Sequence, residues 1–167
     1  SFLPAQDYQW AHSIGSGDAQ YEWANDVEID DAGNVYATGF FFYAVRLDPS
    51  STDLTYSNGA SDIYIQKFSP DGVLLWAHAL GTSGADKGTA LALDGQGQVF
   101  LGGTFDGTLD FADAGGVFTL TASGTMQGFV ARFDANGIAT AAVLVPTPTL
   151  TSNIGLTLRT TTEDEVL

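Results

Sequence analysis

Apolar and polar residues alternate in short runs along most of this chain, and turns rich in glycine, aspartate and asparagine separate the runs. In the run 62–68, Ile63 and Ile65 fall on one side of an extended strand, whereas Tyr64 and Phe68 fall on the other. No run combines helical spacing of apolar residues with capping residues at both ends. The pattern therefore predicts an all-β chain. The expected strands cover residues 26–30, 35–42, 53–56, 62–68, 73–80, 89–93, 98–105, 117–122, 128–133 and 138–145.

The chain repeats itself at an interval of about 65 residues. The tripeptide Trp-Ala-His begins at Trp10 and again at Trp76, and a five-residue run that ends at Phe68 is matched by one that ends at Phe133. Because the matched blocks keep one order along the chain, they indicate two copies of one structural unit. Two pairs of glycines are matched as well, Gly33 with Gly97 and Gly39 with Gly103.

The repeat divides residues 1–145 into two four-stranded units, at about 8–80 and 81–145. The segment 9–14 matches the closing strand of a unit whose earlier strands do not precede it. Residues 146–167 form a separate part, a linker of proline and threonine followed by an acidic tail. Alternation at 154–158 indicates a single strand in this part, and a flexible tail is the alternative.

Strands with large apolar groups on both faces belong in a sheet that is covered on both sides. Four-stranded sheets stacked face to face, as in the blades of a β-propeller, meet this condition. A β-sandwich with duplicated halves is the alternative architecture. A propeller needs about four to eight blades, so two units do not close a ring. The predicted partners are therefore further blades of the same protein or other protein chains.

At these residues the chain resembles the bacterial SBBP-type β-propeller repeats, over about residues 8–145. The resemblance rests on the turn and strand at 30–39, on Leu109-Asp110-Phe111, on the run 62–68, and on the run 72–76 that leads into Ala77-His78. It implies a secreted or cell-surface protein of bacteria, and it implies no particular chemistry. The second unit departs from the pattern, because Ala141 stands where Trp76 stands in the first. The second unit is therefore expected to be the last blade of its array.

The charge of the chain excludes several classes of partner. Twenty acidic and five basic residues give the 167 residues a net charge of −15. A nucleic-acid binder needs a basic face, and binding to anionic lipid needs basic residues too. No apolar run approaches the ~20 residues that cross a bilayer, so membrane insertion is not expected. The absence of cysteine excludes disulfides and thiolate metal sites.

Motifs for catalysis are absent, and the chain is predicted not to be an enzyme. It has neither a Gly-x-Ser-x-Gly nor a His-Glu-x-x-His motif. The two histidines, His12 and His78, hold equivalent places in the repeat. Equivalent positions in stacked sheets lie more than ~10 Å apart, so we expect the histidines to pack with Trp10 and Trp76 rather than to share an ion.

One turn carries hard oxygen ligands and is the best candidate for a cofactor, a calcium ion. The turn contains Asp30, Asp31 and Asn34, and carboxylate and amide oxygens are ligands that Ca²⁺ takes. The alternative is that these side chains only stabilise the turn through their own hydrogen bonds. Otherwise no cofactor is expected.

Aromatic residues in the first long connection form a candidate binding surface. Phe40, Phe42 and Tyr43 belong to one aromatic run, and Tyr56 follows in the same connection. Exposed aromatic groups mark contacts with proteins or glycans. Burial between stacked sheets is the alternative explanation for them.

These observations predict a non-catalytic binding or structural module at the outside of a bacterial cell. It would hold the loops between its strands rigidly and present them for adhesion to proteins or glycans. A first alternative is a subunit of a larger surface complex or filament that assembles through strand edges. A second alternative is a lectin or a carbohydrate-active enzyme on a propeller scaffold. Fold alone does not decide among these functions.

Overall fold

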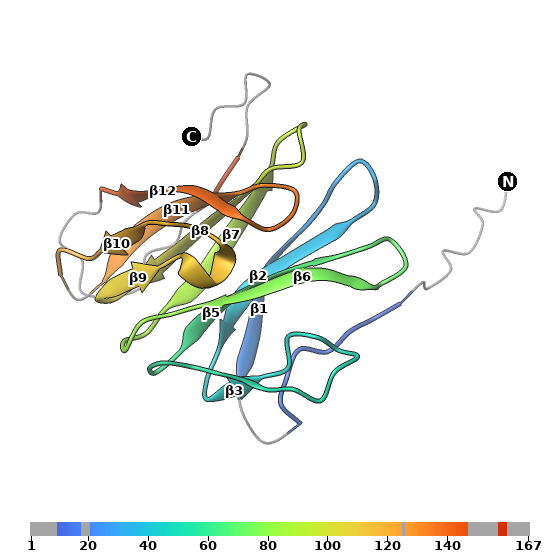
Figure 1. Cartoon of the computed structure of the whole chain (residues 1–167), viewed down its shortest axis with the longest axis horizontal. Coiled ribbons are helices and arrows are strands. Elements are labelled where there is room, and N and C mark those ends of the chain that lie inside the picture. Colours follow the sequence, from blue (N-terminus) through green and yellow to red (C-terminus); the bar gives the residue numbers. More distant parts are fainter. Residues whose placement is uncertain (1–9, 18–20, 125, 147–156, 160–167) are drawn as a thin grey trace, which may run out of the picture.

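The computed structural model describes residues 10–17, 21–124, 126–146 and 157–159. It is all-β, as predicted, and consists mainly of two four-stranded antiparallel sheets that lie face to face (Figure 1). The first sheet has the order β1 (Glu22–Ile29), β2 (Val35–Phe41), β5 (Asp62–Phe68), β6 (Leu74–Leu80). The second has the order β7 (Lys87–Leu93), β8 (Val99–Phe105), β11 (Gln127–Phe133), β12 (Ala139–Val145).

The two sheets are copies of each other in strand pairing as well as in sequence. Val35 pairs with Phe68 in the first sheet, and the equivalent Val99 pairs with Phe133 in the second. The register shifts just before each of these phenylalanines, where β5 meets β6 and where β11 meets β12. The sequence repeat is therefore a repeat of structure, down to the position of a β-bulge.

The first strand is longer than expected, since β1 starts at Glu22 and not near residue 26. The register of β1 against β2 shifts between Ala24 and Asp26. This bulge inserts one residue and moves the following side chains to the opposite face. Trp23 pairs with Phe40 before the bulge, whereas Val27 pairs with Ala37 after it. The broken alternation hid the beginning of the strand.

Each long connection between the second and third strands of a unit contains a small extra hairpin. In the first unit β3 (Ala44–Val45) pairs with β4 (Thr55–Tyr56). In the second β9 (Thr108–Asp110) pairs with β10 (Thr119–Thr121), and a turn of 3₁₀ helix, η1 (Ala112–Ala114), lies between them.

The main core lies between the two sheets. The first sheet contributes Tyr36, Ile63 and Ile65, and the second contributes Leu101 and Phe129, all fully buried. Tyr64 lies on the opposite face of the first sheet and packs with Phe41 and Val45. The predicted division of β5 into two apolar faces is thus confirmed. Both faces of β5 are therefore covered.

Two predicted segments lie partly or wholly outside the regular structure. Residues 10–14, expected to form a closing strand, have no strand pairing, although they pack on the first sheet as described below. Most of the expected strand at 154–158 falls outside the described residues. Of the final part, Pro146 and residues 157–159 are described, and they belong to no strand. Among the residues that the structure describes, no helix is long and apolar enough to cross a membrane.

Candidate functional site

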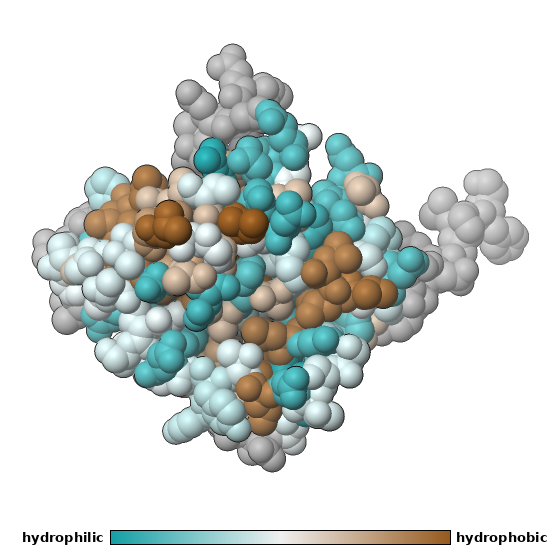
Figure 2. Space-filling model, in the orientation of Figure 1, coloured by the Kyte–Doolittle hydropathy of each residue, from teal (hydrophilic) through white to brown (hydrophobic). Residues whose placement is uncertain are grey.

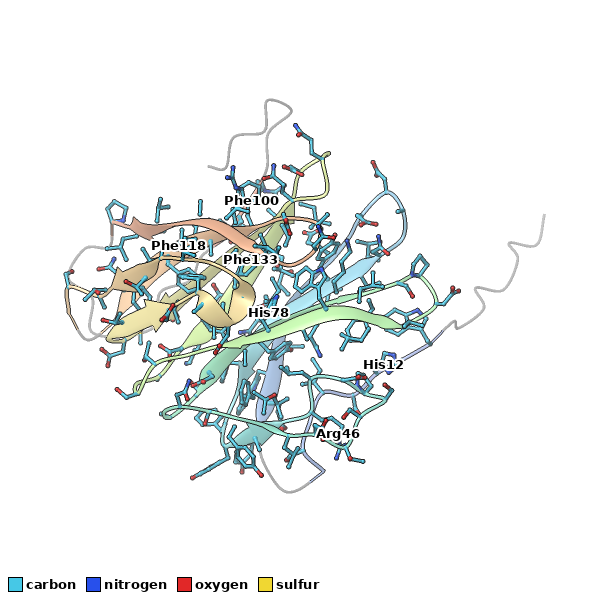
Figure 3. All side chains as sticks on the ribbon, in the orientation of Figure 1. His12, Arg46, His78, Phe100, Phe118 and Phe133 are labelled. Atoms are coloured by element: carbon cyan, nitrogen blue, oxygen red, sulfur yellow. The ribbon has the colours of Figure 1, made fainter. Side chains whose placement is uncertain are left out.

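The two units meet at a contact that Trp76 and His78 of β6 make with Phe133 of the second sheet. The Trp76 and Phe133 rings stack with centroids 6.5 Å apart, and His78 stacks on the same ring at 6.3 Å. The indole Nε1 of Trp76 donates a hydrogen bond to the carbonyl oxygen of Ala135, at 3.2 Å. The ammonium of Lys67 also donates to this carbonyl oxygen, at 3.3 Å. Figure 3 shows His78 between the two sheets, near Phe133.

The same contact occurs a second time at the other face of the first sheet. Residues 10–14, which we call the strap, place Trp10 and His12 on the ring of Phe68, with centroids 5.7 Å and 5.2 Å from it. The indole Nε1 of Trp10 donates to the carbonyl oxygen of Pro70 at 2.8 Å, as Trp76 does to the equivalent Ala135. Each tryptophan thus packs on a phenylalanine ring and donates a hydrogen bond to the neighbouring turn. The strap occupies the place that the closing strand of a preceding unit would take.

A glycine is required in each contact for two reasons. Gly72 and Gly137 have φ values of 78° and 83°, the left-handed conformation that glycine adopts without strain. A Cβ atom on Gly72 would lie 2.8 Å from the Trp10 ring, and one on Gly137 would lie 2.6 Å from the Trp76 ring. The hairpin turns are thus shaped for the indole that rests on them.

The outer face of the first sheet is equivalent, in the repeat, to the face that the second sheet buries against the first. Val27 pairs with Ala37 exactly as Leu91 pairs with Leu101, so Val27 and Leu91 hold equivalent places. Leu91 is buried against the first sheet and only 1% exposed, whereas Val27 is 53% exposed. Ile29, the equivalent of Leu93, is 62% exposed. The first sheet therefore presents an apolar surface of the kind that its neighbour buries.

The outer face of the second sheet matches the buried face of the first in the same way. Phe100 and Val130 hold the places of Tyr36 and Ile65, which are fully buried between the sheets. Leu158 covers part of this face, next to Ala90 and Ala92. The remainder is open, and Val143 is 60% exposed. In Figure 2, apolar side chains gather over β12, which carries Val143.

The turn predicted to hold calcium is held together by its own hydrogen bonds. One carboxylate oxygen of Asp30 accepts from the backbone N–H groups of Ala32 and Asn34, at 3.0 Å and 2.8 Å, and the other accepts from the Asn34 amide at 2.8 Å. Burial would raise the pKa of Asp30, but the hydrogen bonds from Asn34 and Tyr36 and the charge of Lys67 together lower it. Asp31 is exposed. Both aspartates line a cleft of about 900 Å³ between β1 and β7.

The turns of the second unit use the same device. Asp94 accepts hydrogen bonds from the backbone N–H groups of Gln96 and Gln98, and Asp134 accepts from those of Asn136 and Ile138. Among the described residues no three histidine, aspartate or glutamate side chains come together as metal ligands do. The geometry favours turn stabilisation as the role of Asp30, and calcium binding stays a prediction.

Aromatic side chains gather at the end of the first sheet where β1 begins and β2 ends. Trp23 and Phe40 are stacked nearly parallel, with centroids 5.1 Å apart and an angle of 12°. Tyr21 stacks on Trp23 at 5.7 Å, and Phe42 meets both Trp23 and Phe40 edge to face. The ammonium of Lys87 lies 5.0 Å from the centre of the Phe40 ring.

The structure brings only some of the predicted binding residues together. Phe40 and Phe42 are partly buried within the aromatic stack, whereas Tyr43 and Tyr56 stand on the β3–β4 hairpin and are 71% and 69% exposed. Sequence reasoning missed Tyr21 and Trp23, which are 68% and 44% exposed. The signal that could have found them is their spacing of two residues, which Phe40 and Phe42 share.

Two buried carboxylates lie where the loop between the units meets the sheets. Asp86 accepts hydrogen bonds from the backbone N–H of Thr82, at 2.6 Å, and from that of Asp106, at 3.0 Å. Burial raises its pKa to about 6, and the neighbouring Asp62 adds to the rise. Burial raises the pKa of Asp62 as well, and one of its oxygens has no hydrogen-bond partner.

Comparisons with known proteins add no identity to this geometry. No protein-family model matches the chain, and no curated protein is similar to it.

Proposed function

We propose that the chain is a non-catalytic module of a secreted or cell-surface bacterial protein. Its four-stranded units stack face to face as the blades of a β-propeller do, and the ends of the sheets present side chains to protein or glycan ligands. The resemblance to the SBBP-type repeats supports the surface location. An acidic surface keeps such an extracellular β-protein soluble through repulsion between its molecules.

The observation that carries the proposal is the contact that occurs twice. Trp76 with His78 on Phe133, and Trp10 with His12 on Phe68, use the same rings and the same indole hydrogen bond. A contact repeated in one direction is heterologous, because each unit offers one face and accepts the other. Such contacts extend a stack until it closes.

Both ends of the described stack expose apolar side chains at places that are covered between the two units. Val27 and Ile29 are exposed where their equivalents in the second sheet are covered, and Val143 is exposed at the other end. Burial of a valine or isoleucine side chain stabilises a complex by about 1.5–3 kcal/mol. β12 carries Ala141 and Val143 where β6 carries Trp76 and His78, so a further unit on the outer face of the second sheet would pack on apolar side chains rather than on the aromatic pair.

Light scattering on a sizing column tests this proposal. We expect the protein to associate as its concentration rises, because one copy's open faces complement those of another. Val143→Asp should weaken the association at least tenfold, because it places a charge in the contact. Val117→Asp is the matched control, since Val117 is 99% exposed and belongs to neither four-stranded sheet. A single 17.5 kDa species at every concentration would overturn the stacking proposal.

A further inference from the structure

A strained tyrosine marks one end of the first unit. Tyr43 has a φ of 60°, and it is the one described residue other than glycine with a positive φ. The equivalent position in the second unit is Gly107, whose φ is 86°. The turn therefore needs a left-handed residue, and the first unit places a tyrosine where glycine fits without strain. Burial does not explain the choice, because Tyr43 is 71% exposed.

The aromatic stack that includes Phe42, the chain neighbour of Tyr43, is also absent from the second unit. Where the first sheet pairs Trp23 with Phe40, the second pairs Lys87 with Thr104. The repeat thus folds with polar residues at these places, and the scaffold does not require the rings. Side chains common to both units serve the scaffold, whereas these belong to the first unit alone.

Backbone hydrogen bonds hold the aromatic residues at one end of the unit. The N–H of Phe42 donates to the carbonyl oxygen of Tyr21 at 3.2 Å. The N–H of Ser57 donates to the carbonyl oxygen of Tyr43 at 2.8 Å, and this places Tyr56 on the neighbouring strand of the small hairpin. We call this end of the first unit the aromatic end. Its residues are Tyr21, Trp23, Phe42, Tyr43 and Tyr56.

We infer that the aromatic end is a binding site for a neutral oligosaccharide. Three of its members are tyrosines more than two-thirds exposed, and each offers an apolar ring face beside a hydroxyl group. The C–H face of a pyranose packs on such a ring, while the sugar hydroxyls exchange hydrogen bonds with the phenols. The net charge of −15 disfavours an anionic glycan. The stack of Tyr21, Trp23 and Phe40 is preformed, so little order has to be gained on binding.

The strain at Tyr43 supports a role in binding rather than in folding. Backbone strain persists at sites where it serves a function. If packing of the Tyr43 ring compensated for the strain, the ring would be buried. It is 71% exposed. The tyrosine is therefore retained for something outside the chain.

Isothermal titration calorimetry with hexasaccharides of glucose, mannose, xylose and N-acetylglucosamine tests the inference. We expect at least one of them to bind, and we expect Trp23→Ala and Tyr43→Gly each to weaken its binding at least tenfold. Tyr43→Gly should at the same time raise the melting temperature, because glycine relieves the strain. A residue that served folding alone would show the opposite change in stability. Val117→Ala is the control, and it should leave binding unchanged.

Absence of binding to all four sugars would overturn the inference, as would binding that survives both substitutions. The inference rests on the proposed binding role, yet it fails separately from the stacking proposal. Light scattering reports the stacking of units through Val143, whereas calorimetry reports the aromatic end. A protein that stacks and binds none of the sugars would retain the first proposal and lose the second.

Discussion

Phe68 and Phe133 hold the same place in the two sheets, and each carries a tryptophan and a histidine from a segment that lies earlier in the chain. The rings of Trp10 and His12 rest on Phe68, and those of Trp76 and His78 rest on Phe133. The second pair belongs to a paired strand, whereas the first pair belongs to a strap without strand pairing. The ring contact therefore forms without the strand ladder, which means that side-chain packing defines how units meet.

Gly137→Ala should destabilise the protein by about 2–5 kcal/mol. An alanine in the left-handed conformation costs about 1–2 kcal/mol, and overpacking against the Trp76 ring, 2.6 Å from the added Cβ, costs about 1–3 kcal/mol more. Urea unfolding followed by circular dichroism measures the change. Gly95→Ala in the neighbouring turn is the control, because nothing lies within 4 Å of its added Cβ. Equal losses in the two variants would contradict the packing role.

The stability of the protein should fall as the pH rises through about 6, because of Asp86. Burial raises its pKa from 3.8 to about 6. Folding therefore favours the protonated carboxyl, and the stabilisation present below pH 4 is lost above pH 6. A rise of this size corresponds to about 3 kcal/mol at most. Urea unfolding at several pH values between 4 and 8 measures the loss.

Asp62→Asn should move the midpoint of this loss to lower pH, because the charge of Asp62 helps to raise the pKa of Asp86. The amide retains an oxygen that accepts from the N–H of Asn58. Asp53→Asn, at an exposed position, removes the same charge without touching the pair and is the control. If both variants shift the midpoint equally, the effect comes from net charge and not from the buried pair.

Asp30→Ala should cost about 1–2 kcal/mol of stability, whereas Asp31→Ala should cost less than about 0.5 kcal/mol. The first carboxylate accepts hydrogen bonds from Ala32 and Asn34, and the second is exposed. Thermal unfolding of the two variants measures the difference. The same melts with calcium and with a chelator decide between the two roles predicted for this turn. A melting temperature that calcium raises in the native protein, and not in Asp30→Ala, would establish the ion.

The alternation of residues was enough to predict most of the two sheets, because strands buried on both faces leave strong apolar runs such as 62–68. The repeat was enough to predict the equivalence of Phe68 with Phe133, since both copies keep the residues of one contact. The hairpins were harder, because β3 and β9 contain only two and three residues and such strands show no period.

The aromatic end was only half visible in the sequence. Phe40, Phe42 and Tyr43 stand together in the chain, but Trp23 becomes their neighbour only through the pairing of β1 with β2. The bulge after Ala24 reverses the alternation, so Trp23 and Val27 face opposite sides although they stand four positions apart. The sequence does not show the strain at Tyr43, because the strain follows from the positive φ of this residue. Gly107 holds the equivalent turn of the second unit and adopts a positive φ without strain.

Leu158→Ala should cost about 2 kcal/mol, at the lower end of the range for a buried leucine because its neighbours are small. Leu158 is 8% exposed and packs on Ala90 and Ala92 of β7, and a Cβ on Gly102 would lie 3.1 Å from its side chain. Leu158 thus covers the outer face of the second sheet at the place where β7 covers the equivalent face of the first sheet. Urea unfolding measures the change, and Thr157→Ala, at the exposed neighbouring position, is the control. An unchanged free energy of unfolding in Leu158→Ala would mean that this segment does not rest on the second sheet in solution, and the whole outer face would then be open to a further unit.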